Sequence, residues 1–155
     1  GKKLKYILDG GQCKIGLEST IIDLTGKPTI LRHGAINTKK ISKILKKKIS
    51  INKRTKSIKS PGQLKYHYSP GIPVFMNKIK AKKSGAFITF GKKFKSANNH
   101  FNLSKSYNLK IAANNLYKTM RKIKNQNFKS ISICKIPNVG IGKAINERLK
   151  KASNK

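Results

Sequence analysis

The sequence has few acidic residues and few of the side chains that form metal sites or disulfide frameworks. Only four of its 155 residues are Asp or Glu, against 37 Lys and Arg, so the formal net charge is +33. It has two cysteines, three histidines and no tryptophan. Cys13 and Cys134 lie far apart with no CxxC pair, and the histidines lack the spacing of metal ligands. We therefore expect neither a disulfide framework nor a zinc site.

Long apolar runs are also missing. No run approaches the ~20 residues that a membrane-spanning helix needs, and residues 1–4 (G-K-K-L) carry no apolar segment of a signal peptide. Hydrophobic residues make up 37% of the chain, which is enough for a core. These features favour a cytoplasmic protein with no membrane association, and they leave its oligomeric state open.

The high basic charge has two possible interpretations. Only four of the 37 basic residues are arginines, and Lys, Ile and Asn, which can be encoded by A and T alone, supply 68 of the 155 residues. The lysines could therefore reflect an AT-rich genome and form a solvated surface. They could equally serve a polyanionic partner, because a basic surface attracts phosphates. Composition alone leaves both interpretations of the charge open.

The first third of the chain predicts a small mixed α/β unit. Residues 4–8 are apolar and β-branched enough for a short strand, ended by an Asp-Gly-Gly turn. Residues 19–24 and 29–32 flank a Gly/Pro turn and predict a hairpin. Apolar residues on one face of 39–48 predict a short helix with Thr38 as its N-cap.

Two composition changes divide the rest of the chain. Residues 52–71 show no apolar period and contain two Ser-Pro-Gly breakers, so we expect a linker between a unit at 1–51 and a unit at 72–155. In the second unit, strands at 72–76, 86–90 and 130–134 alternate with helices at 108–125 and 143–152. This alternation favours an α/β architecture with a parallel sheet.

The four acidic residues are the only candidates for carboxylate acid/base chemistry: Asp9, Glu18, Asp23 and Glu147. Glu18 and Asp23 are five positions apart, so on one strand they face opposite sides. An ordinary role in turns and at strand edges is favoured over catalysis for these two residues. Three of the four acids still cluster at 9–23, which indicates a constrained segment.

Three motifs in order resemble a known family. The first has two parts, because residues 16–23 read G-L-E-S-T-I-I-D and residues 31–36 read L-R-H-G-A-I. The second is P-G-Q-L-K-Y-H-Y-S-P at residues 61–70, and the third is G-I-G-K-A-I-N-E-R-L at residues 140–149. Together they resemble the second half of the YrdC-like domain, the interdomain linker and the close of the extra domain in two-domain threonylcarbamoyl-AMP synthases. The resemblance implies the C-terminal part of a YrdC-like α/β domain, a linker, and a small Rossmann-like C-terminal domain.

The resemblance also implies a reaction and its site. The family joins L-threonine, bicarbonate and ATP into threonylcarbamoyl-AMP and pyrophosphate, for N6-threonylcarbamoyladenosine formation on tRNA. Ser19 would contact L-threonine, Arg32 and Tyr68 would contact ATP, and His67 would only pack beside them. Magnesium is expected to accompany ATP. A hydroxyl suits a carboxylate or ammonium group, a planar guanidinium suits phosphate oxygens, and a linker aromatic can close over a nucleotide.

The sequence departs from the family in two ways. His33 stands where the family usually has proline, which loosens the turn that carries Arg32. The family's K-x-R and S-x-N segments, which supply many ATP and threonine contacts, have no counterpart here. We therefore expect the 155 residues to be the C-terminal part of a longer enzyme, and to be inactive alone.

Two other functions stay open. The charge favours a small basic RNA-binding protein without catalysis, in contact with tRNA or double-stranded RNA, although single-strand binders need more aromatic side chains than 7% provides. Alternatively, residues 72–155 form a docking module that stabilises a partner. Salt-sensitive tRNA binding without any response to ATP would favour the RNA-binding protein. A deletion of residues 72–155 that changes only stability would favour the docking module.

Overall fold

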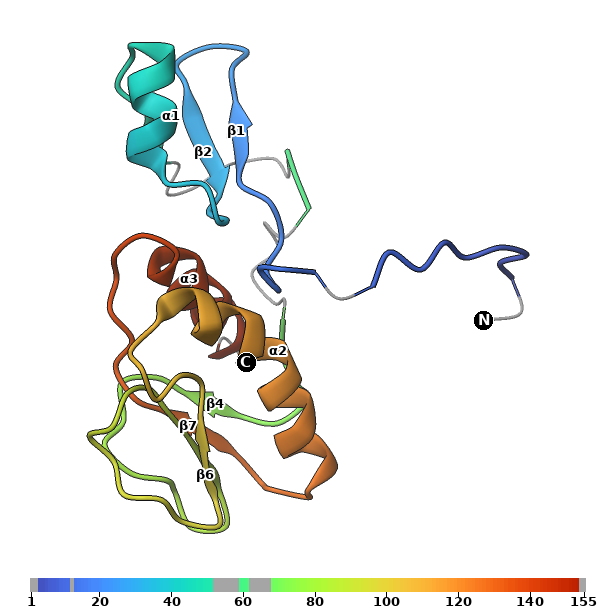
Figure 1. Cartoon of the computed structure of the whole chain (residues 1–155), viewed down its shortest axis with the longest axis vertical. Helices are drawn as coiled ribbons and strands as arrows, with labels where there is room; N and C mark the ends of the chain where they lie inside the picture. Colours follow the sequence, from blue (N-terminus) through green and yellow to red (C-terminus); the bar gives the residue numbers. More distant parts are fainter. Residues whose placement is uncertain (1–2, 12, 52–58, 62–67, 154–155) are drawn as a thin grey trace.

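The computed structural model describes residues 3–11, 13–51, 59–61 and 68–153. Its first unit is a three-stranded sheet in the order β1-β2-β3, with α1 beside it (Figure 1). The predicted hairpin is confirmed, because β1 (Ile21–Asp23) pairs antiparallel with β2 (Thr29–Arg32). A third strand, β3 (Ser50–Ile51), runs parallel to β2. At two residues it is too short for a sequence pattern to predict.

The first helix, α1 (Thr38–Leu45), is shifted from its predicted bounds. Its N-cap is Asn37 and not Thr38, because the Asn37 side chain accepts a hydrogen bond from the Lys39 amide at 2.9 Å. Asparagine is the stronger capping residue of the two. The helix ends at Leu45 because Lys46 adopts a left-handed conformation with φ of 50°.

The strand predicted at residues 4–8 is wrong. This segment has no regular secondary structure and extends away from the two sheets (Figure 1). Its four large apolar side chains are exposed, and Leu8 is fully so. A strand is stable only beside another strand, and no strand in the described part of the chain pairs with this segment.

The second unit is the predicted parallel α/β layer. Its strands lie in the order β4-β7-β5-β6 and all pair in parallel. Strand β6 was not predicted, because its sequence His-Phe-Asn carries no run of apolar residues. The elements are β4 (Val74–Phe75), β5 (Ala86–Thr89), β6 (His100–Asn102), α2 (Leu109–Asn125), β7 (Ile131–Ile133) and α3 (Gly142–Ser153).

The hydrophobic core lies almost entirely in this second unit. The inner sides of α2 and α3 pack on the sheet, with Leu116, Ile123 and Leu149 fully buried. Among the described residues before residue 72, only Ile30 is a buried hydrophobic residue. The buried apolar packing thus lies in the second unit, whereas the first unit has almost none within its own sheet. None of the helices described has the length and apolarity to cross a membrane.

This division predicts unequal protection from hydrogen exchange. Backbone amides of β5 and β7 should exchange slowly, because their strands are central and buried, while those of α1 and β1 should exchange at least 100-fold faster. Exchange of the whole chain followed by mass spectrometry of peptides measures both. Equal protection of the two units would contradict a core confined to the second.

Candidate functional site

Ser19 and Arg32 lie in direct contact at the end of the hairpin. Arg32 closes β2 and Ser19 precedes β1, so the pairing of these strands brings the two residues together. The Arg32 guanidinium donates from Nε to the Ser19 carbonyl oxygen at 3.1 Å and from Nη2 to Ser19 Oγ at 3.2 Å. Arg32 is buried and Ser19 is exposed. A fixed positive charge therefore lies behind an accessible hydroxyl.

Close backbone packing holds this pair in place. A Cβ added to Gly34 would lie 2.2 Å from the Thr20 amide nitrogen and 2.5 Å from the Ser19 carbonyl carbon, so only glycine fits. The turn after Arg32 therefore lies directly on the backbone of Ser19. Arg32 also donates from Nη1 to the Pro61 carbonyl oxygen at 3.4 Å, which brings the start of the Pro-Gly motif to the same place.

Tyr68 packs against the second unit. Its ring stacks on Tyr117 of α2 with centroids 5.8 Å apart, and the Arg148 guanidinium lies 5.4 Å from its ring centroid. Its φ of 65° is unusual for a bulky residue and indicates that these contacts hold it there. Burial raises the pKa of the Tyr68 phenol and nearby Glu18 adds to the rise, against the opposite effect of Arg148 and Arg32. The phenol is thus protonated at neutral pH.

A buried arginine of α3 joins these parts. Arg148 is only 1% exposed, and its Nε donates to Glu18 Oε2 at 3.1 Å. Its Nη1 donates to the His33 carbonyl oxygen at 2.6 Å. The Tyr117 hydroxyl donates to the same Glu18 oxygen at 3.3 Å. Glu18 precedes Ser19 and His33 follows Arg32, so Arg148 contacts both segments that carry the predicted site residues.

Glu18 is ionised and forms an ion pair with Arg148. Burial by itself raises the pKa of Glu18, but a hydrogen bond from its own backbone amide and the charges of Arg148 and Arg32 outweigh burial, and the pKa lies below its ordinary value. A lowered pKa contributes stability above the unfolded value and loses it as the pH falls through the folded value. Such a carboxylate is a poor general base near neutral pH, since a catalytic base needs a pKa near the working pH.

The His33 peptide is held on both sides. Its amide donates to Glu147 Oε2 at 3.0 Å, while its carbonyl accepts from Arg148. Proline, the residue expected from the family at this position, has no amide hydrogen to donate. His33 therefore does not leave the turn loose, because its amide adds a hydrogen bond between the two units. Burial lowers the pKa of the His33 imidazole, and the charges of Lys143 and Arg148 lower it further, although Glu147 has the opposite effect. Because the net shift is downward, His33 is neutral at pH 7.

The structure thus brings Ser19 and Arg32 into contact and links Tyr68 to them through Glu18 and Arg148. Sequence reasoning named Ser19, Arg32 and Tyr68 but gave no role to Glu147, Arg148 or Tyr117. The available signal was rarity, because two of the four acids (Glu18 and Glu147) and two of the four arginines (Arg32 and Arg148) are in this cluster. His67 lies outside the described residues.

The two other acids have ordinary local roles. Asp23 accepts from the Thr25 hydroxyl at 2.6 Å and from the Thr25 amide at 3.0 Å, and it pairs with Lys59 at 3.1 Å. The Thr25 hydrogen bonds, with the Lys59 charge, lower the pKa of Asp23 to about 2. Asp9 accepts from the Gly11 amide in the predicted turn. Cys13 and Cys134 are both free thiols.

A cavity lies between the two units beside this cluster. It measures about 720 Å3, and the first unit contributes His33 and Ile51 to its wall. The second unit contributes the residues after β4 and β7 and one side of α3, including Lys143 and Glu147. A space large enough for a small molecule therefore borders the turn that carries Arg32.

Comparisons with known proteins agree on one family. A family model described as "Threonylcarbamoyl-AMP synthase, C-terminal domain" matches residues 36–154, and one described as "Telomere recombination" matches residues 1–34. The threonylcarbamoyl-AMP synthase of Pyrococcus abyssi is 30% identical over 172 aligned positions, covering 97% of this chain and 50% of that protein. That of Schizosaccharomyces pombe is 34% identical over 97 residues, covering 55% of this chain and 24% of that protein.

Solved structures give the same result. The crystal structure of P. abyssi Sua5 complexed with L-threonine matches with a TM-score of 0.81 and 27% identity, over 98% of this chain and 50% of that chain. A second structure of the P. abyssi protein, in which a neighbouring histidine and tyrosine are replaced by alanine, matches with a TM-score of 0.76 and 25% identity, over 94% of this chain and 47% of that one. The chain spans about half the length of these P. abyssi relatives.

The hydrogen bond at His33 predicts a difference between two substitutions. His33→Pro removes the amide hydrogen that is donated to Glu147, whereas His33→Ala keeps it. We expect the proline variant to be less stable than the alanine variant by about 1.5–3 kcal/mol, the range for a hydrogen bond to a charged group. Denaturant unfolding of the whole chain measures both.

Proline also restricts the backbone of residue 32, but Arg32 is already extended in β2, so this effect is small. In a Glu147→Ala background the gap between the two His33 variants should shrink. An unchanged gap in that background would mean that Glu147 is not the reason for it.

Proposed function

The chain belongs to the threonylcarbamoyl-AMP synthase C-terminal domain family, and from this we propose that it acts within an L-threonylcarbamoyladenylate synthase. Such an enzyme forms threonylcarbamoyl-AMP and pyrophosphate from L-threonine, bicarbonate and ATP for tRNA modification. The P. abyssi enzyme of this name is about twice as long as this chain. The activity is therefore proposed for a whole enzyme and not for the 155 residues alone.

We assign the substrate contacts to Ser19 and Arg32, with L-threonine at the hydroxyl and ATP at the guanidinium. The single observation that supports this most is the 3.2 Å contact between Ser19 Oγ and Arg32 Nη2. It orients the hydroxyl and keeps a positive charge where a carboxylate or phosphate would approach. A similar protein has been solved in complex with L-threonine. Electrostatic stabilisation of the phosphates is the main requirement of nucleotidyl transfer.

Tyr68 is the proposed aromatic contact to ATP. It belongs to the only His-Tyr pair in this chain, and a His-Tyr pair is replaced by alanine in one similar structure. In the present arrangement its ring is held by Tyr117 and Arg148. We propose that residues 52–71 are the linker between a catalytic portion at 1–51 and a C-terminal domain at 72–155. In this arrangement the C-terminal domain holds the linker tyrosine beside the Ser19–Arg32 pair.

Magnesium does not fit the residues described. Mg2+ prefers carboxylate and phosphate oxygens, and no cluster of three metal-ligating side chains occurs in the described part of the chain. Glu18 and Glu147 are engaged by Arg148, and Asp23 is engaged by Lys59. We therefore assign no step of the reaction to a metal held by this chain.

The test is pyrophosphate release from ATP by the full-length enzyme, in the presence of L-threonine and bicarbonate. Arg32→Ala should lower kcat/KM at least 100-fold, because it removes both the phosphate contact and the support of Ser19. Ser19→Ala should mainly raise the KM for threonine. Arg121→Ala, on the exposed side of α2, is the matched control and should leave the rate unchanged.

Unchanged rates in both Ser19 and Arg32 variants would refute their assignment. A protein that binds tRNA with a steep salt dependence, yet releases no pyrophosphate, would instead support the RNA-binding alternative.

A further inference from the structure

A second cavity lies in the C-terminal unit, away from the cluster around Ser19 and Arg32. It measures about 580 Å3, within the range of sites for small organic ligands. Thr89 and Asn102, the last residues of β5 and β6, form part of its wall together with Gly91, which follows β5. Ligands of open parallel sheets bind outside the carboxyl ends of the strands, which is where these three residues are.

The cavity opens on the face of the sheet opposite α2. Phe101 packs on Phe128 just after α2, so the alternate residues of β6, His100 and Asn102, point to the opposite face. The connections from β4 to β5 and from β5 to β6 contain no helix, and both are fully described. Parallel sheets are normally covered by helices on both faces. Here loop 90–99 covers β5 and β6 instead and leaves the cavity beneath it.

Hydrogen bonds give the cavity a fixed wall. The Asn102 side chain donates to the Gly91 carbonyl oxygen at 2.6 Å and accepts from the Ser104 amide at 2.9 Å. His100 Nδ1 lies 2.8 Å from the Lys95 carbonyl oxygen, which can only accept, so Nδ1 carries the proton and Nε2 is left for a ligand. The His100 ring also packs edge to face on Phe87 at 5.2 Å. These groups are therefore positioned before any ligand arrives.

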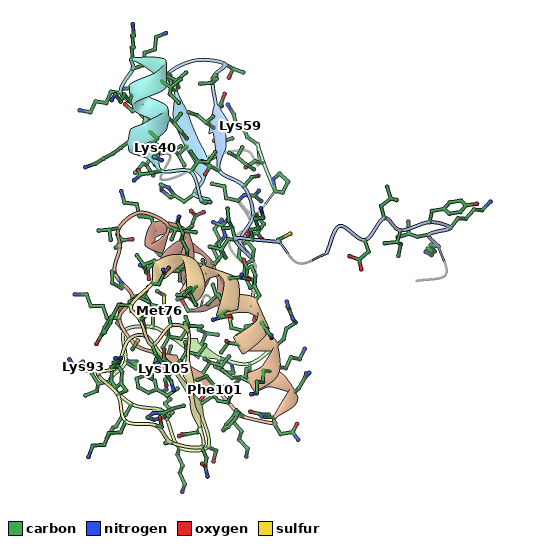
Figure 2. The ribbon with its side chains drawn as sticks, viewed as in Figure 1. Lys40, Lys59, Met76, Lys93, Phe101 and Lys105 are labelled. Carbon is green, nitrogen blue, oxygen red and sulfur yellow. The ribbon has the colours of Figure 1, made fainter. Side chains whose placement is uncertain are left out.

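The chemistry of the lining is that of an anion site with an aromatic surface. Three lysines line the cavity, and none of its lining residues, all in the described part of the chain, is acidic. Lys105 and the neighbouring loop residue Lys93 lie on the side of the sheet away from α2 (Figure 2). Phe94 contributes a half-buried ring, held edge to face on Phe87 at 4.9 Å. The lining lysines are Lys92, Lys95 and Lys105.

We propose that this cavity binds a mononucleotide or a phosphate ester of similar size, with its phosphate on the lysines and its ring against Phe94. Lysine ammonium groups bind phosphate as point charges, and a planar base can pack on an aromatic ring. The volume suits a single nucleotide and not a polymer. The site is separate from the proposed synthase site, since its lining shares no residue with the cluster around Ser19, Arg32 and Tyr68.

Calorimetric titration of the whole chain with AMP, adenosine and inorganic phosphate tests the proposal. AMP should bind more tightly than either of the others, because only AMP carries both the phosphate and the ring. The double variant Lys92→Ala/Lys105→Ala should lower AMP affinity at least tenfold, which corresponds to one charge-assisted hydrogen bond. The control Lys110→Ala/Lys118→Ala removes the same charge from exposed positions on α2 and should change affinity less than twofold.

A third variant separates this site from the proposed synthase site. Arg32→Ala should leave AMP binding in the second cavity intact. Loss of AMP binding in Arg32→Ala but not in Lys92→Ala/Lys105→Ala would place the nucleotide at the synthase site and overturn the proposal. Equal losses in the cavity and control lysine variants would mean diffuse attraction to a cationic surface, which also overturns it. Failure of the synthase assay would leave this result unaffected.

Discussion

The burial of the Arg148 guanidinium between the two units is the constraint on which the rest of the site depends. A buried charge is tolerated only when it is paired and hydrogen-bonded. Here the partners are Glu18, the His33 carbonyl and the face of Tyr68. Each belongs to, or adjoins, a segment that carries a proposed substrate contact. The requirement to satisfy one arginine therefore fixes the hairpin, Tyr68 and α3 relative to one another.

This constraint explains why a unit with almost no core keeps its position. The hairpin and α1 bury a single hydrophobic residue among those described, so their own packing contributes little stability. Glu147 and Arg148 hold the His33 peptide by its amide and its carbonyl, and Gly34 lets the turn lie on the backbone of Ser19. The proposed site is thus formed by contacts from the C-terminal unit. Residues 72–155 would then take part in the reaction by positioning the residues that touch substrate.

The sequence predicted what depends on local pattern. The hairpin, the parallel sheet, α2 and α3 follow from β-branched runs and helical periodicity, and three motifs identified the family. The sequence-based predictions failed where the structure depends on residues far apart in the chain. Residues 4–8 have a strand pattern without a neighbouring strand, and β6 gains its place only from pairing with β5. Arg148 lies 130 positions from Glu18, and no local rule pairs them. His33 was predicted to loosen a turn that its amide instead secures, because Glu147 comes from another unit.

A double-mutant cycle between Glu18 and Arg148 tests this account most directly. The free energy of unfolding of the whole chain would be measured for Glu18→Gln, Arg148→Met, and the two combined, with Arg121→Met replacing Arg148→Met in a control cycle. Since Glu18 is one-third exposed, we expect a coupling of about 1–2 kcal/mol at neutral pH, below that of a fully buried pair. The control cycle should be additive within about 0.5 kcal/mol. Additivity in both cycles would show that the buried arginine does not hold the two units together.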